Sequence, residues 1–315
     1  MDAPLVSAWT ALCQALAPAF TTPTFLTFLH LVSGWALCPG RATVTHFICT
    51  IGSSLLGQAS KHWTAYEKFF YRAVWEPAEV SRLLLAKVVG PLLEGRGADD
   101  DGVLDLLIDD TTAGRHGSHV ALAGYFRDAS VGNTKAKVVH WSHNWIVAVA
   151  ALALPRWKGW VMGLPVLAAL YRKQPDCDAD HPFMTRQQLA ARLIHEAHQA
   201  LPGRKIRVKT DGQYATKEVA AATFQVGGML ISRLRGDSAL FALPPKRPRA
   251  GRGRPKRRGR RLATPKAMAK SGRGWHTIYV TLGGKKVRRR VKSMTCLWWH
   301  VAKVHPVKVV IARVR

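Results

Sequence analysis

The order of apolar runs between residues 103 and 234 constrains the fold more than any other feature of the sequence. Three strand-like runs come first, and a helix, a strand, a helix and a strand follow, at residues 103–108, 136–154, 159–171, 186–201, 206–209, 217–224 and 228–234. Continuous apolar runs suit buried strands, whereas apolar residues spaced by three and four suit one face of a helix. This order predicts an α/β fold, in which helices flank a central mixed sheet.

The first third of the chain has a helical pattern. Apolar residues recur at three and four spacing in residues 12–20 and 25–36. The aromatic-rich segment 63–75 is interpreted as helical core rather than as a platform on which nucleic-acid bases stack. Glycines between residues 95 and 102 predict a hinge. We therefore predict a helical N-terminal domain over residues 1–98 and a core domain over residues 99–237.

The charge of the chain is distributed very unevenly. The 315 residues contain 47 Lys and Arg but 19 Asp and Glu, which gives a net charge of +28. No acidic residue follows Asp237, and 23 of the basic residues lie in 238–315. A solvated basic surface would explain a short run of charges, but a stretch of this length favours a polyanionic partner. Nucleic acid is the commonest such partner, because neutralised phosphates release condensed counterions.

Residues 238–315 are predicted to form a third, basic region. Segment 244–265 is dense in Pro, Gly and Arg, which predicts a flexible loop. Two runs that flank Gly283-Gly284 predict a β-hairpin with a basic second arm. We expect the basic residues of the loop to contact phosphates, namely Arg247, Arg249, Arg252, Arg254, Lys256, Arg257, Arg258, Arg260 and Arg261.

Cysteine and hydropathy patterns exclude several other classes of protein. The five cysteines are scattered without CxxC spacing, so the sequence indicates neither a zinc site nor a disulfide framework. The N-terminus lacks a signal-peptide pattern. The longest apolar run, residues 146–155, is about half of what a membrane-spanning helix needs. We expect a reducing cytosol and no membrane partner.

Two acidic residues follow predicted strands of the central sheet. Asp110 ends the run that begins at residue 103, and Asp211 follows the strand at 206–209. Ligands of open α/β sheets gather at the carboxyl ends of the strands. A pair of carboxylates there suits Mg²⁺, which prefers oxygen ligands and phosphate substrates. Together with the basic surface, this pair predicts metal-dependent phosphoryl transfer on DNA or RNA.

The same two acids also have a purely structural explanation. Asp110 is followed by Thr111-Thr112, and this sequence could cap a turn. Asp211-Gly212 is a common turn sequence in its own right. The residue pattern by itself leaves both interpretations open.

Three sequence blocks resemble those of DDE transposases from insertion sequences. LLIDDTTAGRHGSHVALAGYF resembles the family's first catalytic block, in which a strand ends in an acid followed by Thr. KAKVVHWSHNWIVAVAALAL, with its His-Asn-Trp element, resembles the strands that follow. RKIRVKTDGQYATKEVAAA resembles the block of the second Asp. The resemblance covers roughly residues 40–237, and its specificity lies in the order of the three blocks.

The resemblance implies a ribonuclease H-like fold, in which the first and fourth strands lie side by side. It makes Asp110, rather than Asp109, the partner of Asp211, because Asp110 directly precedes Thr. The two carboxylates would hold Mg²⁺ or Mn²⁺. The implied activity is that of a transposase and endonuclease, which cuts and joins double-stranded DNA at terminal inverted repeats and target DNA. A homodimer on paired ends, in the bacterial cytoplasm and at the nucleoid, is also implied.

The third carboxylate of the family has no counterpart in this sequence. The family places it, usually as Glu, on a helix after an inserted β-rich region. Neither Glu196 nor Glu218 matches that position, and no acid follows Asp237. We expect residues 238–315 to be part of such an insertion, with the chain incomplete at its C-terminus. Two alternatives stay open: a non-catalytic DNA-binding remnant of a transposase, or a ribonuclease H-like nuclease that acts on RNA.

Overall fold

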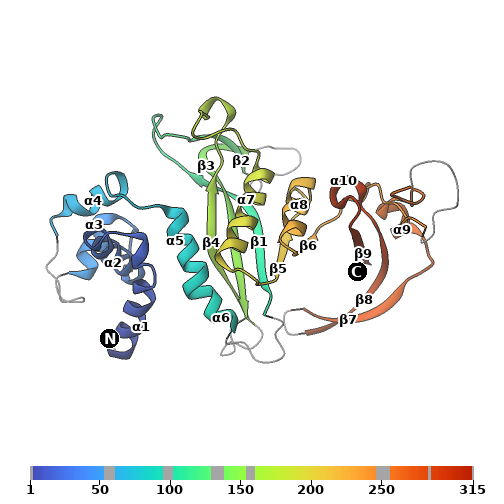
Figure 1. Cartoon of the computed structure of the whole chain (residues 1–315), viewed down its shortest axis with the longest axis horizontal. Coiled ribbons are helices and arrows are strands. Elements are labelled where there is room, and N and C mark those ends of the chain that lie inside the picture. Colours follow the sequence, from blue (N-terminus) through green and yellow to red (C-terminus); the bar gives the residue numbers. More distant parts are fainter. Residues whose placement is uncertain are drawn as a thin grey trace. The chain divides into compact units, whose positions relative to one another are not determined.

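The computed structural model describes most of the chain, in two compact units. The described residues are 3–52, 61–94, 102–128, 138–153, 160–245, 256–282 and 285–313. The first unit is Met1–Gly95 and the second is Arg96–Arg315 (Figure 1). The predicted division of the second unit at residue 237 stays a prediction.

Helices form the described part of the first unit. They are α1 (Ala3–Gln14), η1 (Ala17–Ala19), α2 (Thr22–Leu37), α3 (Val44–Ile51), α4 (Trp63–Tyr71), α5 (Pro77–Leu83), the π-helical η2 (Leu84–Val89) and α6 (Gly90–Glu94). None of the helices in the described ranges is long and apolar enough to cross a lipid bilayer.

Aromatic residues make much of the core of the first unit. Tyr66 and Phe69 of α4 are buried together with Leu31, and the partly buried Phe20 and Trp75 pack against this cluster. The hydroxyl of Tyr66 lies 2.9 Å from Nδ1 of a buried histidine. The same short helix also presents Trp63, Phe70 and Tyr71 to solvent. The aromatic segment is thus partly core and partly surface.

A six-stranded mixed sheet is the centre of the second unit. Its strands are β1 (Leu104–Gly114), β2 (Gly124–Asp128), β3 (Val138–Ala153), β4 (Val161–Leu170), β5 (Ile206–Thr210) and β6 (Met229–Ser232). The order is β2-β3-β1-β5-β6, and β4 also pairs with β3 (Figure 1). β1 is antiparallel to β3 but parallel to β5, and β5 is parallel to β6.

The mixed α/β character of this unit confirms the coarse prediction of fold class. The first and fourth predicted strands, now β1 and β5, are neighbours in the sheet. β2 was not predicted from the sequence. It is a short strand that pairs with one end of the long β3, where its glycine and charged residues gave no apolar signal.

Two helices flank the parallel strands of this sheet. α7 (Arg186–Ala200) begins with a capping box, in which Thr185 accepts a hydrogen bond from the backbone of Gln188 and the Gln188 side chain accepts one in return. One face of α7 is buried and includes Leu193 and Ile194. α8 (Lys217–Gln225) contacts α7 and β6. A short 3-10 helix, η3 (Gln174–Asp176), precedes α7.

A separate three-stranded antiparallel sheet forms the C-terminal part of the second unit. Its order is β7-β8-β9, with β7 (His276–Leu282), β8 (Lys285–Leu297) and β9 (Pro306–Arg313). Short helices α9 (Pro265–Lys270) and α10 (Trp299–Ala302) accompany it. Leu240, Cys296 and Val309 make a small core at one end of this sheet.

Strand β1 offers a direct test of the sheet core. Leu106 is fully buried, whereas its neighbour Leu107 is 39% exposed on the other face. We expect Leu106→Ala to lower the free energy of unfolding by about 2–5 kcal/mol, because it leaves a cavity in the core. Leu107→Ala should cost about 1 kcal/mol at most. Urea unfolding of the full chain measures both, and equal losses would contradict the observed register.

Candidate active site where the β1–β5 pairing ends

The parallel pairing of β1 with β5 brings the two predicted acids to one edge of the sheet. The register ends with Ile108 beside Thr210, so Asp109 and Asp110 follow on one strand where Asp211 follows on the other. β1 itself continues to Gly114, paired with β3, so the prediction that Asp110 ends its strand was wrong. A hollow of about 790 Å³ lies at this edge. It is lined by Leu107, Ile108, Asp109, Asp110, Thr111, Val147, Val149, Lys209, Thr210, Asp211 and Arg233. We call it the carboxylate hollow.

Several donors hold the carboxylate of Asp110. It shares the side of β1 on which alternate residues such as Leu106 and Ile108 are buried. Nδ2 of Asn144 donates to Oδ2 at 3.0 Å, and the hydroxyl of Tyr214 donates to Oδ1 at 3.1 Å. Nε of Arg186 lies 4.0 Å from Oδ2. These contacts fix the orientation of the carboxylate.

Arg186 extends this network away from Asp110. Its Nε donates to Oδ1 of Asn144 at 2.9 Å. Its guanidinium lies over the ring of Tyr171, at 5.1 Å from the centroid, and over that of Phe126, at 5.9 Å. Asn144 is almost fully buried, and both ends of its amide have a hydrogen-bond partner, as buried polar groups usually do. The network therefore makes Asn144 a rigid support for Asp110.

Asp211 is held by the turn that follows β5. Its Oδ1 accepts hydrogen bonds from the backbone N–H groups of Gln213, at 2.7 Å, and Tyr214, at 3.3 Å. This is the turn that the sequence offered as the alternative explanation, and it is present. The turn also delivers the Tyr214 side chain to Asp110. Tyr214 thus connects the two aspartates, through its backbone to one and through its hydroxyl to the other.

Asp109 is a third carboxylate at the same hollow, and it is more exposed than Asp110. Its Oδ1 accepts a hydrogen bond from the Asp110 backbone at 2.9 Å. Partial burial raises the pKa of Asp109 above its ordinary value, and repulsion from Asp211 and then from Asp110 raises it further. Negative charge is therefore concentrated at the hollow without full compensation.

The cations near the hollow are only partly available to balance this charge. Lys209 lines the hollow, but its Nζ donates to Asp105 at 2.9 Å. Arg207 also pairs with Asp105 through two hydrogen bonds. Burial would raise the pKa of Asp105, but these two cations hold it below its ordinary value. Arg233 is the other basic residue of the lining.

The carboxylates of Asp110 and Asp211 are oxygen ligands of the kind that Mg²⁺ takes in proteins. This ion keeps several waters and takes one or two carboxylates together with substrate phosphates. Within the described ranges, no group of three or more His, Cys, Asp or Glu side chains is placed to hold a metal ion. Glu196 pairs with Arg192 at 3.1 Å on α7, and Glu218 lines a different hollow. Neither of these glutamates lines the carboxylate hollow.

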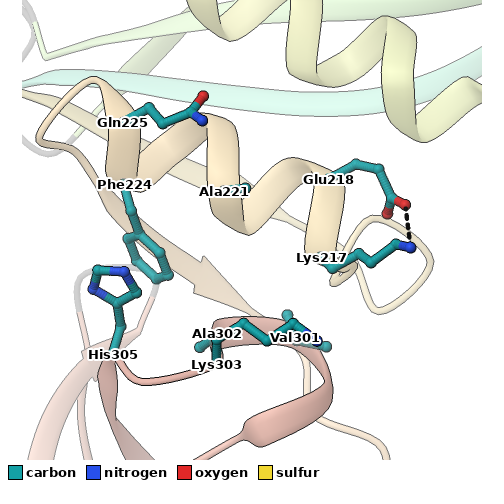
Figure 2. Close-up of a pocket in the computed structure, with 9 residues that line it drawn as sticks. All are labelled: Lys217, Glu218, Ala221, Phe224, Gln225, Val301, Ala302, Lys303 and His305. Atoms are coloured by element: carbon teal, nitrogen blue, oxygen red, sulfur yellow. Dashed lines mark ion pairs between the residues drawn. The ribbon is translucent and has the colours of Figure 1, made fainter.

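That second hollow, of about 670 Å³, lies between α8 and α10 (Figure 2). The rings of Phe224 and His305 contact each other at one side of it, with centroids 4.3 Å apart. Lys217 and Glu218 form an ion pair at its edge, at 3.6 Å. Its lining comes from α8, which accompanies the central sheet, and from α10 and the turn before β9 of the three-stranded sheet. The hollow therefore lies where these two parts of the second unit meet.

The predicted DNA-contacting loop is described only in part. Arg247, Arg249, Arg252 and Arg254 lie outside the described residues. Lys256, Arg257, Arg258, Arg260 and Arg261 are exposed. The Arg258 guanidinium lies 4.4 Å from the centroid of the Phe241 ring and 5.3 Å from that of Trp299. Arg258 therefore packs on the protein, which gives it a structural contact that the sequence did not indicate.

Sequence reasoning identified the two aspartates but not the residues that support them. Asn144 was visible as part of the His-Asn-Trp element, without a role. Arg186 and Tyr214 gave no signal, because one is the first residue of a helix and the other follows a turn. Their contacts with Asp110 depend on how three separate segments meet.

One comparison with known proteins shows the family of the chain. The sequence profile of the DDE superfamily endonucleases matches residues 15–293. The chain therefore belongs to the DDE superfamily of endonucleases, a family of enzymes that typically use divalent metal ions.

The other two comparisons add little. No curated protein matches the sequence. Among solved structures, the chain is similar to the piggyBac transposase in a cryo-EM structure of its synaptic complex with hairpin DNA, with 11% identity and a TM-score of 0.30. The match covers 97% of this chain and 51% of that chain, so this chain spans about half the length of the transposase it matches.

The repulsion between carboxylates predicts a change in titration. We expect Asp211→Asn to lower the pKa of Asp109 toward its ordinary value, because the variant removes a neighbouring negative charge. A raised folded-state pKa means that ionised Asp109 weakens folding at neutral pH, and this penalty disappears as the pH falls through that pKa. Carbon-13 NMR of the carboxyl carbons measures the shift. Asp105 is the control, and an unmoved Asp109 would contradict the expected repulsion.

Proposed function

We propose that this chain is a transposase that cleaves and joins DNA strands with a divalent metal ion held by Asp110 and Asp211. The observation that carries the proposal is the β1–β5 pairing, which brings both acids to one hollow. Membership of the DDE endonuclease superfamily supports the same chemistry. The proposed ion is Mg²⁺ or Mn²⁺, and the proposed substrate is double-stranded DNA at the inverted repeats and target site of an insertion sequence.

The strand order supports a ribonuclease H-like fold for the catalytic unit. β4, β3 and β1 form an antiparallel meander, and β5 and β6 continue the sheet parallel to β1. α7 and α8 provide the crossovers to β5 and β6. In such a sheet the first and fourth strands, here β1 and β5, are central neighbours. Asp110 lies on the first of these strands and Asp211 directly follows the second.

The residues of the chain have distinct roles in the proposed reaction. A bound divalent ion would activate the attacking oxygen and stabilise the leaving oxygen of a phosphodiester. Asn144 and Tyr214 orient Asp110, and the turn after β5 orients Asp211. Arg233 lines the hollow and is placed to pair with a phosphate, because a guanidinium matches phosphate oxygens in pairs. The hollow thereby binds and orients the scissile phosphate.

A second candidate function is DNA binding without cleavage. It is favoured by the lining of the carboxylate hollow, which includes no glutamate among the residues that the structure describes. A strand-nicking assay with Mg²⁺ on duplex DNA that carries the element's terminal repeats separates the two functions. Metal-dependent nicking by the 315-residue chain supports the transposase, whereas tight binding without nicking supports the second candidate. Competition by RNA, but not by duplex DNA, would instead indicate a nuclease of RNA.

Substitution of the three aspartates tests which of them hold the metal ion. We expect Asp110→Asn and Asp211→Asn each to lower nicking by roughly 100-fold or more, because each removes a charged oxygen ligand. Asp109→Asn is the matched control, and it should stay within about 10-fold of the unmodified chain. DNA binding without metal should be unchanged in all three. If Asp109→Asn abolished nicking while Asp110→Asn did not, the assignment of Asp110 would be wrong.

The support given by Asn144 is tested separately. Asn144→Ala removes the amide that donates to Asp110 and accepts from Arg186. We expect kcat for nicking to fall by about 10–100-fold, with a higher Mg²⁺ requirement and an unchanged KM for DNA. Thermal unfolding serves as the control for folding. A rise in KM with kcat unchanged would show that Asn144 binds DNA rather than positions Asp110.

A further inference from the structure

The register of the three-stranded sheet sorts its basic residues onto two different faces. In an antiparallel sheet, paired residues share a face and successive residues alternate. Arg288 pairs with Tyr279, and Arg290 pairs with Arg313 across the other edge. Together with Lys286, these residues make one exposed surface, which we call the cationic face: Tyr279, Lys286, Arg288, Arg290 and Arg313.

The opposite face of the same strands has another character. Val287 is half-buried and Val291 is buried there, together with the half-buried Ile278 of β7. Arg289 projects from this apolar face, and its guanidinium donates to the Arg288 backbone carbonyl at 3.2 Å. Three consecutive arginines in β8 are therefore divided by the pleat, with two on the cationic face and one on the apolar face.

The charge of the cationic face is not neutralised by the sheet that carries it. No acidic residue follows Asp237, so the three strands contain no carboxylate. Arg290 and Arg313 are directly opposite one another, and like charges in that position destabilise a sheet. An anion bound between them removes this repulsion. The arrangement is therefore one that an anionic ligand stabilises.

Aromatic rings, rather than acidic side chains, hold these cations in place. The Lys286 ammonium lies 5.3 Å from the centroid of the Tyr279 ring, and that tyrosine is 62% exposed. Arg313 and Arg290 lie 4.4 and 6.0 Å from the centroid of the Trp275 ring. Rings hold cations in place without cancelling their charge. One N–H of the Arg313 guanidinium donates to the Ala269 backbone carbonyl at 3.2 Å, and its other N–H groups, like those of Arg290, can still meet phosphate oxygens.

Lys292 of the same sheet is a basic residue with a structural role. Its side chain is buried, and its Nζ donates to the backbone carbonyls of Met268 and Ser271, at 2.8 Å each. Burial and the charge of Arg313 lower the pKa of this lysine. Lys292 shares the side of β8 with Arg288 and Arg290, but it is buried there and anchors α9 to the sheet, so it does not belong to the exposed cationic face. Arg288 and Arg290, by contrast, are exposed to solvent.

We propose that the cationic face of β7, β8 and β9 is a binding surface for the phosphate backbone of duplex DNA, separate from the carboxylate hollow. Alternate residues of β8 are about 6.8 Å apart, so Lys286, Arg288 and Arg290 present a regular row of charges. A two-stranded ribbon also fits the major groove of duplex DNA. The inference rests on the proposed function only in taking DNA as the polyanion.

Two arginines on opposite faces of one strand allow a matched test. Fluorescence anisotropy measures binding of the full chain to a duplex over a range of salt concentrations, without divalent metal. We expect Arg288→Gln/Arg290→Gln to reduce the slope of log affinity against log salt by about 1.8, because each lost phosphate contact removes about 0.9. Arg289→Gln, on the apolar face, should change the slope by less than about 0.3. Arg288→Lys/Arg290→Lys keeps the charge and should retain most of the slope.

Each contrary outcome has a definite meaning. An unchanged slope in the double glutamine variant, or an equal loss in Arg289→Gln, overturns the assignment of the cationic face. A loss of slope in the charge-preserving lysine variant would also overturn it, since the arginines would then be structural. The same holds if the double variant loses slope with RNA but not with duplex DNA. If the unmodified chain binds no duplex DNA, the proposed function fails as well, and this result is distinct from the others.

Discussion

The parallel pairing of β1 with β5 is the constraint on which the rest of the second unit depends. Parallel neighbours cannot be joined by a tight turn, so the chain must travel through β3, β4 and α7 before it returns beside β1. The residues that make the pairing, such as Leu106 and Val208, are fully buried. The pairing is therefore stabilised by the core, and the two aspartates that follow it are placed by that core rather than by their own contacts.

At the carboxylate hollow, local hydrogen bonds determine how well the charge of each aspartate is balanced. Partial burial raises the pKa of Asp109, and the like charges of Asp211 and Asp110 raise it further. Asp110 is instead surrounded by donors from β3, α7 and the turn after β5. The excess negative charge is what makes the edge suitable for a cation. The acid-free three-stranded sheet carries the complementary excess of positive charge, well suited to phosphates.

The sequence predicted the elements of the fold well where one physical signal dominated. Apolar runs and helical spacing gave the strands and helices of residues 103–234, because burial of their apolar side chains decides their structure. β2 was missed because it is short and has no such signal. Alternation along β1 places Asp109 and Asp110 on opposite faces of the strand. It could not show that both would reach the same hollow.

What the sequence determined by itself is the mixed α/β type of fold, the position of Asp211 directly after a strand, and the acid-free C-terminal region. Each follows from local pattern or composition, which needs no knowledge of distant contacts. Only the tertiary structure decided that Asn144, Arg186 and Tyr214 meet at Asp110, since they come from three segments. The same is true of the cationic face, because the register of β8 with β9 sets Arg290 against Arg313. Contacts between remote segments depend on how the elements pack.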